Sequence, residues 1–492
     1  MSARGRLLLP ALLLLAPLLR AQESANVQAR RLLEDGRVYW TQGKLKQAIE
    51  NFNIIVASFP NSDSVDQALL EIGRYRMDVE GDTEKAKASF DQVAKQYPQS
   101  PGAPGAYYYL GLLTLNRATT AADLDDALAQ FTRVQNLYPR SDWVPRALQA
   151  MGLVHRRAGR LADAVDVSRR VSLEYPSTAA AAAAQFQVGQ CLALLGEPRP
   201  AMEEFQRVRN RFPASEWAPR ALDRITALYR LFGGAKPTFA LDSGYSVASG
   251  DMLKDVRAIL MTSSGTLWIL SDKSKVAAPY DAGGKAGSSL GVEDPRALSL
   301  TSREEIVVAV KTAVRIGPKD IKSFSVPSDK PGVPEPLERI LSATVTPGGA
   351  VLVADEKKKK VHRFDASFQY LGTFPEKDPK ERTVTRMLLD GEGGIVLLDK
   401  EEKTVRVYDE AGRVLRTLGP AGLKKPVDAA VDPFRNTYVV DEEAGVLVFG
   451  EKGQLLTTLG GAEMKKAKAL TLDPTGAVLV YDERAEKILR FR

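Results

Sequence analysis

The sequence predicts a multidomain protein in which an α-helical superhelix is followed by an all-β ring of six small sheets. Three observations support this fold class. Short aromatic–proline marks recur through the first half, and stretches ending in aspartate recur through the second half. Between them lies a glycine-containing joint, "FGGAKP" (residues 232–237). We therefore expect a leader over residues 1–21, a helical repeat domain over 25–232 and a β domain over 237–492.

The first half repeats with a period of about 38 residues. The marks are "FPNS", "YPQS", "YPRS", "YPST" and "FPAS", and their prolines are Pro60, Pro98, Pro139, Pro176 and Pro213. A fixed period in this range indicates stacked repeats. Because proline cannot continue a helix, each mark is expected to end one.

Within each helical repeat, an alanine and a phenylalanine precede the proline at helical spacing. Ala48 and Phe52 are four residues apart, and the same pair recurs at Ala86 and Phe90, at Ala127 and Phe131, and at Ala201 and Phe205. Offsets of four and eleven residues share one face of a helix, which predicts a buried stripe. An earlier helix carries Gly73, Gly111, Gly152 or Gly189, where a small residue permits close helix packing. The fourth copy departs from the pattern, with Ser168 in place of the phenylalanine.

This helical pattern resembles the tetratricopeptide repeat over about residues 25–232. The form "G…A-x-x-x-F…YP-x-S" is similar to the repeats of periplasmic outer-membrane assembly and cell-division coordinator proteins. The resemblance implies protein or peptide partners, but repeats of this kind bind very different partners. The tyrosines Tyr107, Tyr108 and Tyr109 either line a concave peptide groove or pack in the helical core.

The second half repeats about every 42 residues. The stretches "TPGGAVLVAD", "DGEGGIVLLD", "DPFRNTYVVD" and "DPTGAVLVYD" each contain a turn, an apolar strand and a final aspartate. These aspartates are Asp355, Asp399, Asp441 and Asp482. A short strand precedes each unit and two more follow it, which gives four strands and the period of a propeller blade.

Two earlier units, "TSSGTLWILS" and "TSREEIVVAV", bring the number of blades to six. The sixth blade lacks its outer strand, and "PTFALDSGYSV" (residues 237–247) is an unassigned strand before the first blade. We expect this segment to complete the sixth blade and close the ring, with Phe239 and Leu241 sharing one strand face. The blades resemble those of NHL-type six-bladed propellers.

The start of the chain predicts export. "MSARGR" is positively charged, and residues 7–19 form an apolar run shorter than a membrane span, which is typical of a signal peptide. We expect cleavage after Ala21; an uncleaved N-terminal anchor is the alternative. The single cysteine, Cys191, lies in an apolar helical context far from the leader. A single cysteine excludes an internal disulfide. Its position far from the leader argues against a lipid anchor.

Net charge argues against a nucleic-acid partner. The chain carries +7, of which residues 1–21 supply +3. Residues 22–236 hold 27 basic and 24 acidic side chains, and residues 237–492 hold 38 and 37. A nucleic-acid-binding surface requires concentrated basic charge.

The sequence shows no convergent catalytic set. "GSSLG" (residues 287–291) matches the G-x-S-x-G pattern around Ser289, but that elbow needs a strand before it, a helix after it and a histidine base. The two histidines, His155 and His362, are too few for a typical zinc site.

Two ligand sites remain as alternatives in the propeller. The four strand-end aspartates either bind calcium or cap their own turns through backbone hydrogen bonds. The innermost strands begin with Arg257, Arg296, Arg386 and Lys468, with Asp428 opposing them. These cations either hold an anionic ligand at the channel mouth or form ion pairs with the four strand-end aspartates.

From these features we expect an exported, non-enzymatic interaction scaffold of the cell envelope, periplasmic or secreted and without a cofactor. The alternative is a propeller-based enzyme or a sensor that binds calcium or another ligand.

Overall fold

The computed structural model describes residues 9–248, 250–317, 321–328, 333–376, 380–419, 422–460 and 463–492, with side chains from Gln22 onward. Residues 1–8 of the expected leader therefore lie outside the described residues. The chain divides into two compact units, Met1–Val154 and His155–Arg492. The second unit contains the later helices as well as all the strands, so the division falls within the helical repeats.

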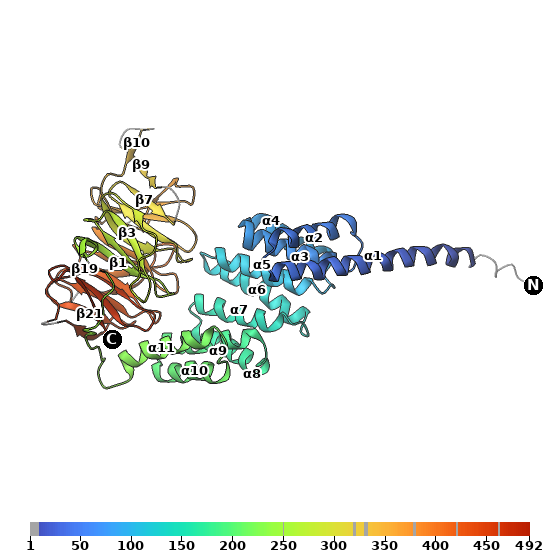
Figure 1. Cartoon of the computed structure of the whole chain (residues 1–492), viewed down its shortest axis with the longest axis horizontal. Helices are drawn as coiled ribbons and strands as arrows, with labels where there is room; N and C mark the ends of the chain where they lie inside the picture. The colour runs from blue at the N-terminus through green and yellow to red at the C-terminus, as the bar shows by residue number, and fades with distance from the viewer. Residues whose placement is uncertain are drawn as a thin grey trace, which may run out of the picture. The chain divides into compact units, whose positions relative to one another are not determined.

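The first unit is a stack of helices, coloured blue to cyan in Figure 1. Its elements are α1 (Leu9–Thr41), α2 (Leu45–Ser58), α3 (Val65–Tyr75), η1 (Arg76–Glu80), α4 (Thr83–Gln96), α5 (Ala103–Arg117) and α6 (Ala121–Leu137). The next helix, α7 (Val144–Arg157), crosses into the second unit. That unit continues with α8 (Leu161–Glu174), α9 (Ala179–Leu194), α10 (Pro198–Arg211) and α11 (Trp217–Phe232).

The predicted phenylalanine stripe packs directly on the predicted glycines. A Cβ atom added at Gly73 would lie 2.4 Å from the Phe90 ring, and one added at Gly111 would lie 2.6 Å from the Phe131 ring. These rings are fully buried. The glycine is therefore required because an aromatic ring of the next helix occupies the space of a side chain.

The β region of the second unit is a ring of six antiparallel sheets. The first two sheets are β1 (Val256–Met261), β2 (Leu267–Ser271), β3 (Val276–Tyr280) and β4 (Leu290–Gly291), then β5 (Pro295–Leu300), β6 (Ile306–Val310), β7 (Ala313–Ile316) and β8 (Lys322–Ser323). A hairpin of β9 (Ser325–Pro327) and β10 (Pro334–Pro336) follows.

The remaining four sheets repeat the same order of strands. They are β11 (Ile340–Val345), β12 (Val351–Asp355), β13 (Lys360–Phe364) and β14 (Tyr370–Thr373); β15 (Val384–Leu389), β16 (Ile395–Asp399), β17 (Thr404–Tyr408) and β18 (Val414–Leu418); β19 (Pro426–Val431), β20 (Thr437–Asp441), β21 (Gly445–Phe449) and β22 (Leu455–Leu459); and β23 (Ala467–Leu472), β24 (Val478–Asp482) and β25 (Lys487–Phe491).

The expected closing strand pairs with the sixth blade. Leu241 forms an antiparallel bridge with Phe491, and the backbone N–H of Ala240 donates to the Arg492 carbonyl at 2.8 Å. The Arg492 N–H returns a bond of 2.9 Å to the Ala240 carbonyl. The Leu241 side chain is 39% exposed, whereas Phe239 is half-buried in the core of the last blades. The pairing is short, so Leu241 lies on an edge rather than between two sheets.

Hydrogen bonds from inner-strand side chains join neighbouring blades. The Ser299 hydroxyl donates to the Ala343 carbonyl at 2.8 Å, and the Met387 N–H donates to the Ser342 hydroxyl at 3.0 Å. Across the point of ring closure, the Met261 N–H donates to the Thr471 hydroxyl at 2.9 Å. The ring is therefore held by specific polar contacts as well as by apolar packing.

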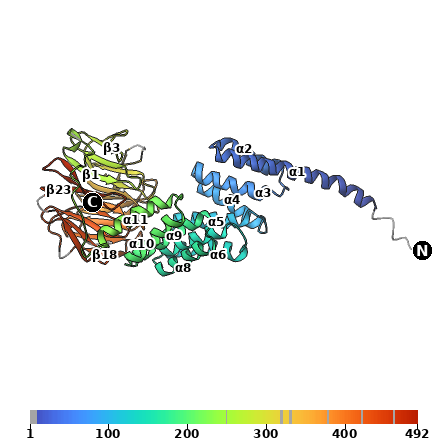
Figure 2. The same cartoon turned by 60° about the horizontal axis from the view of Figure 1, so that its bottom comes forward.

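Helix α11 packs against the last two blades, as Figure 2 shows. Leu228 shares a buried cluster with Phe434, and Leu231 shares another with Tyr438. At Gly476, an added Cβ would lie 2.8 Å from the Ala227 Cβ. Because Gly476 also has a φ of +76°, both its conformation and the approach of α11 favour glycine there.

Candidate functional site

The predicted cationic ring at the channel mouth is divided by backbone register. In each innermost strand the pairing shifts at the second residue, for example between Val384 and Arg386 and between Pro426 and Asp428. A bulge of this kind turns consecutive side chains toward different environments. Arg257, Arg296 and Lys468 occupy the bulge position, whereas Arg386 and Asp428 lie one position later. The five residues therefore do not form one ring.

Arg386 and Asp428 form a buried ion pair at the centre of the propeller. The Arg386 Nε lies 3.1 Å from Asp428 Oδ1, and the two residues are 4% and 5% exposed. Arg386 also donates to the Leu298 carbonyl, while Asp428 Oδ2 accepts from the Leu470 N–H at 2.8 Å. These bonds reach from β15 to β5, β19 and β23, so the pair fills the centre instead of offering a guanidinium to a ligand.

The other three cations lie at the periphery of this centre. Arg257 pairs with Asp272 at 2.5 Å, and Arg296 is exposed. Lys468 pairs with Glu442 at 2.7 Å, and Lys425 binds the other oxygen of the same carboxylate. Burial raises the pKa of Glu442, but the hydrogen bonds from Lys425 and Lys468 outweigh it and bring the pKa to about 2. Ion pairing therefore accounts for Arg257, Arg386 and Lys468, but their partners are Asp272, Asp428 and Glu442 and not the four strand-end aspartates.

The strand-end aspartates hold turns. Asp441 shows the arrangement most fully: its Oδ2 accepts from the N–H groups of Lys424 and Lys425 at 2.6 and 2.7 Å, and its Oδ1 accepts from Glu443 and Ala444. Asp355, Asp399 and Asp482 likewise accept from backbone amides of their own turns. In the first blade, the Ser271 hydroxyl takes this position and accepts from the Ser274 N–H at 3.2 Å. The backbone-capping interpretation therefore describes these carboxylates.

The remaining chemical candidates are far from a catalytic arrangement. Ser289 is exposed in the loop before β4, and strands rather than a helix follow it. Among the described residues, no group of three or more His, Cys, Asp or Glu side chains is placed to hold a metal ion. Cys191 is buried in α9, and burial raises the pKa of its thiol to about 12.

Two of the three tyrosines of α5, Tyr108 and Tyr109, contact each other with ring centroids 5.3 Å apart, whereas Tyr107 contacts a different aromatic ring. Tyr109 is buried and stacks on Phe90 with ring centroids 5.1 Å apart, as the core interpretation predicts. Tyr108 is half-buried and packs on Trp143 at 5.3 Å. Tyr107 lies on the side of α6, 6.1 Å from the Tyr138 ring. They therefore do not line one groove together.

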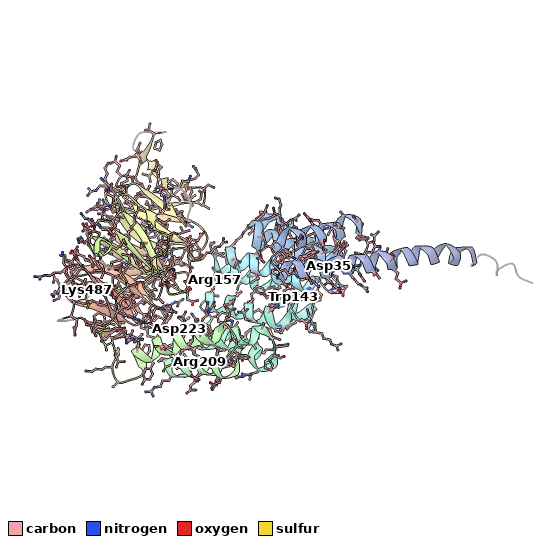
Figure 3. All side chains as sticks on the ribbon, in the orientation of Figure 1. Asp35, Trp143, Arg157, Arg209, Asp223 and Lys487 are labelled. Carbon is pink, nitrogen blue, oxygen red and sulfur yellow. The ribbon has the colours of Figure 1, made fainter. Side chains whose placement is uncertain are left out.

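Tyr108 belongs to a stripe of alternating arginines and aromatic rings, which sequence reasoning missed. The Arg74 guanidinium lies 4.9 Å from the Trp40 ring centroid and 5.9 Å from the Tyr109 ring centroid. Arg146 lies 5.0 Å from the ring of Trp143, which Figure 3 labels. Tyr109 in turn contacts Tyr108 and Trp143, with ring centroids 5.3 and 5.5 Å apart. We call Trp40, Arg74, Tyr108, Tyr109, Trp143 and Arg146 the arginine–aromatic stripe. Its members come from four segments of the first unit, so no local motif reveals it.

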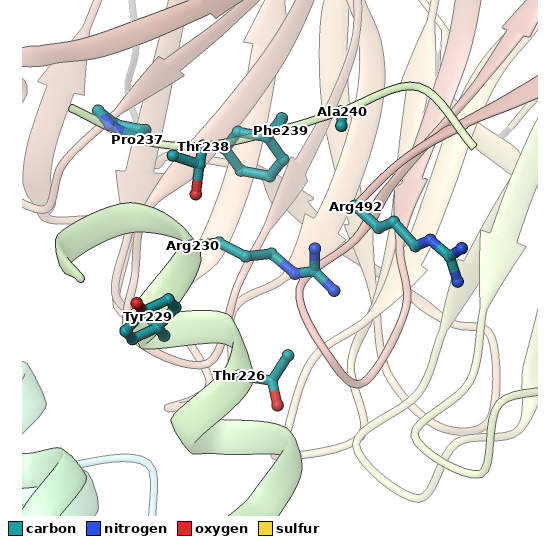
Figure 4. A pocket seen from close by; sticks show the side chains of 8 residues that line it. All are labelled: Thr226, Tyr229, Arg230, Pro237, Thr238, Phe239, Ala240 and Arg492. Atoms are coloured by element: carbon teal, nitrogen blue, oxygen red, sulfur yellow. The ribbon is translucent and has the colours of Figure 1, made fainter. Parts of the chain in front are cut away.

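A second feature missed from the sequence is a pocket of ≈ 450 Å³ in the second unit (Figure 4). The last turns of α11 form one wall and the closing strand forms the other. Its lining residues are Thr226, Tyr229, Arg230, Pro237, Thr238, Phe239, Ala240 and Arg492. The pocket exists because the closing segment folds back on the helix, with the Thr238 N–H donating to the Arg230 carbonyl at 2.8 Å.

Family models match two segments of the helical region. Residues 25–166 match the YfiO family, described as an outer membrane lipoprotein, and residues 183–215 match the tetratricopeptide repeat. The chain joins tetratricopeptide-type repeats to a six-bladed β-propeller. No curated protein matches the sequence.

Solved propellers are similar to the second half of the chain at 13% identity. They include a catalytically inactive virginiamycin B lyase from Staphylococcus aureus with quinupristin (TM-score 0.40, covering 51% of this chain and 85% of that chain). A gluconolactonase from Xanthomonas campestris has a TM-score of 0.38, and the match covers 49% of this chain and 87% of that chain. The propeller domain of Doa1 has a TM-score of 0.37, and the match covers 51% of this chain and 96% of that chain.

Proposed function

We propose that the protein is an exported, non-enzymatic scaffold of the cell envelope that binds partner proteins or peptides. The observation that carries this proposal is the match of residues 25–166 to a family described as an outer membrane lipoprotein. Tetratricopeptide-type repeats add a large preformed surface suited to protein partners. The partners we expect are components of outer-membrane or envelope assembly.

The arginine–aromatic stripe is the surface that we assign to partner binding in the first unit. Trp40, Arg74, Tyr108 and Trp143 are half-buried and Arg146 is exposed. Arginine and large aromatic side chains contribute most binding energy in many protein interfaces. Arg74 is already paired with Glu71 at 2.6 Å. The exposed Arg146 guanidinium, held over the Trp143 ring, remains able to pair with a carboxylate. The stripe therefore suits a peptide segment that carries acidic and apolar side chains.

The centre of the propeller supports a role without catalysis. A catalytic site in a propeller needs reactive groups exposed to substrate, whereas Arg386 and Asp428 are buried and bonded to each other. The four strand-end aspartates are likewise engaged by backbone amides. We infer that the propeller acts as a binding surface or spacer rather than as an enzyme.

We also propose that the protein reaches the envelope through its leader and attaches there through proteins. Cys191 is the single cysteine and is buried in α9, so it is not placed to carry a lipid. None of the helices in the described part of the chain has the length and hydropathy needed to cross a membrane. N-terminal sequencing of the envelope-associated protein should give a start near Gln22.

In-cell cross-linking compared between two charge-reversal variants tests this function. Arg146→Glu reverses the exposed charge of the stripe, while Lys95→Glu reverses an exposed charge near the end of α4 that forms only a 4.0 Å helix-surface ion pair with Asp91. Partners cross-linked by wild type and by Lys95→Glu should be envelope proteins that are lost with Arg146→Glu. Recovery of the protein only in the cytosol, or equal cross-linking by all three forms, would contradict the proposal.

A further inference from the structure

The pocket between α11 and the closing strand has one cationic group directed into it. Figure 4 shows the Arg230 side chain extending from α11 into the space below Thr238 and Phe239. Its Nε donates to the Thr475 carbonyl at 3.2 Å, and its Nη2 lies 3.5 Å from the Thr475 hydroxyl. These two contacts fix the guanidinium in place without neutralising its charge.

Arg230 lacks a carboxylate partner. The nearby Asp473 is taken by Arg490, whose Nη2 lies 2.8 Å from Asp473 Oδ2, and Asp242 is shared by Arg490 and Arg492. Among the described residues, no acidic oxygen lies within 4.0 Å of the Arg230 guanidinium nitrogens. Burial lowers the pKa of Arg230, the charge of Asp473 acts in the opposite direction without a direct ion pair, and the neighbouring Arg490 and Arg492 lower the pKa further. A half-buried cation without a counter-charge is energetically unfavourable, and a bound anion would relieve this cost.

Apart from Arg492, the rest of the lining is apolar or neutral. Tyr229 is 62% exposed, and with Phe239, Pro237 and Ala240 it supplies ring and aliphatic surface. Thr226 and Thr238 add two hydroxyl groups, and none of the eight lining side chains is acidic. The volume of ≈ 450 Å³ is within the range of sites for small organic ligands. Arg492 lines the same pocket, but it is paired with Asp242 at 3.3 Å.

We propose that this pocket binds a carboxylate attached to an apolar group, with Arg230 holding the carboxylate and Tyr229 and Phe239 enclosing the apolar part. A small arylalkanoic acid and the terminal carboxylate of a peptide with an apolar last residue share this chemistry. The site lies in the second unit, apart from the arginine–aromatic stripe, and its ligand is additional to the partner proposed there.

Ligand-observed NMR on the full chain tests the proposal with defined probes. One arm uses 3-phenylpropionate and a second uses N-acetyl-alanyl-alanyl-phenylalanine with a free carboxylate. Their carboxamide analogues are the controls because they keep shape but lose the charge. We expect both acids to bind and the amides to bind at least about tenfold more weakly, as expected for the loss of a charge-assisted contact. Binding by only one of the acids would identify the source of the ligand, and binding of neither would overturn the proposal.

Variants then locate the binding. Arg230→Gln should weaken acid binding roughly tenfold or more, whereas Arg220→Gln on the same helix, outside the lining set, should retain wild-type affinity. If Arg230→Gln lowers the melting temperature strongly, Tyr229→Ser serves instead because that side chain is exposed, and it should weaken binding of both acids. Unchanged affinity in Tyr229→Ser and in a folded Arg230→Gln, or equal binding of acid and amide, would overturn the assignment.

Discussion

Arg386 Nε lies 3.1 Å from Asp428 Oδ1, and this pair connects four of the six blades through its other bonds. Removing one member of a buried pair leaves an uncompensated charge, which costs about 3–5 kcal/mol. We therefore expect Arg386→Met to lower the free energy of unfolding by that amount, measured by urea denaturation.

The controls for the central pair are an exposed pair and a double variant. Arg257→Met breaks the pair with Asp272, in which both side chains are partly exposed, and should cost less than about 1 kcal/mol. Arg386→Met combined with Asp428→Leu should recover part of the loss because no charge is then left unpaired. If Arg386→Met and Arg257→Met lower the free energy of unfolding equally, the central pair contributes no more to stability than an exposed pair.

Glycine substitutions test the contact between α11 and the last blade. Gly476 and Gly349 occupy the same turn of different blades with φ values of +76° and +88°. An added Cβ at Gly349 meets nothing within 4 Å, whereas at Gly476 it meets Ala227 of α11. Backbone strain should lower the free energy of unfolding of both alanine variants by about 1–2 kcal/mol. Overpacking should lower it by a further amount of about 1–3 kcal/mol only in Gly476→Ala. Identical melting temperatures for the two variants would mean that α11 does not rest on this turn.

The ring closure can be tested by removing one hydrogen-bond donor. Ala240→Pro deletes the N–H that donates to the Arg492 carbonyl, while Ala235→Pro changes an exposed residue of the preceding joint. The lost bond itself is worth about 1 kcal/mol, and opening of the ring should add to the cost. Ala240→Pro should therefore melt at a lower temperature and bind more of a dye specific for exposed apolar surface. Closure by another route is indicated if the two proline variants behave alike.

Asp432 should make stability depend on pH. Burial raises its pKa to about 6, although Asn436 and the backbone amides of Phe434 and Asn436 favour the charged form. A carboxyl group with a raised pKa binds more protons in the folded state than in the unfolded state. The folded state is therefore destabilised as pH rises from about 4 through 6, by up to about 3 kcal/mol. In Asp432→Asn this loss between pH 4 and pH 7 should disappear.

A matched control for Asp432 is Asp365→Asn. Asp365 accepts the same two kinds of backbone hydrogen bond, from Ser367 and Gln369, but in an exposed turn. Unfolding curves of the wild type and both variants at pH 4, 5, 6 and 7 separate burial from the general effect of losing an acid. The assignment to Asp432 fails if its variant retains the pH dependence of the wild type.

Periodicity predicted the architecture because each half repeats its own packing arrangement several times. The phenylalanine–glycine contact recurs at Gly73 and Gly111, and the aspartate-capped turn recurs at Asp399 and Asp441. A pattern that recurs is visible even when one copy departs from it. The closing pairing was predictable for the same reason, because the sixth repeat lacked a strand. In the structure residues 240–242 pair with the last strand of that blade.

The sites were less predictable because they depend on details of backbone register and folding back of the chain. Arg386 follows the bulged residue of its strand, whereas Arg257 and Arg296 are themselves the bulged residues of their strands and are exposed. The alternation of apolar residues alone does not reveal this shift. The pocket brings Arg230 and Phe239 together only because a turn after α11 reverses the chain. The pocket has no local sequence signature. The shift of Arg386 does have one, because Arg386 lies 13 residues before Asp399 whereas Arg257 lies 14 residues before Ser271.

The pairing of Ala240 with Arg492 also sets an order in time. When synthesis or export proceeds from the N-terminus, the closing segment emerges before any blade, while its partner strand emerges after all of them. The edge of residues 240–242 must therefore wait for about 250 residues to appear, and closing so long a loop is entropically costly. During this interval the open ring exposes an unpaired strand edge, which favours association with other chains. Chaperone demand should consequently peak late, when the sixth blade is still missing.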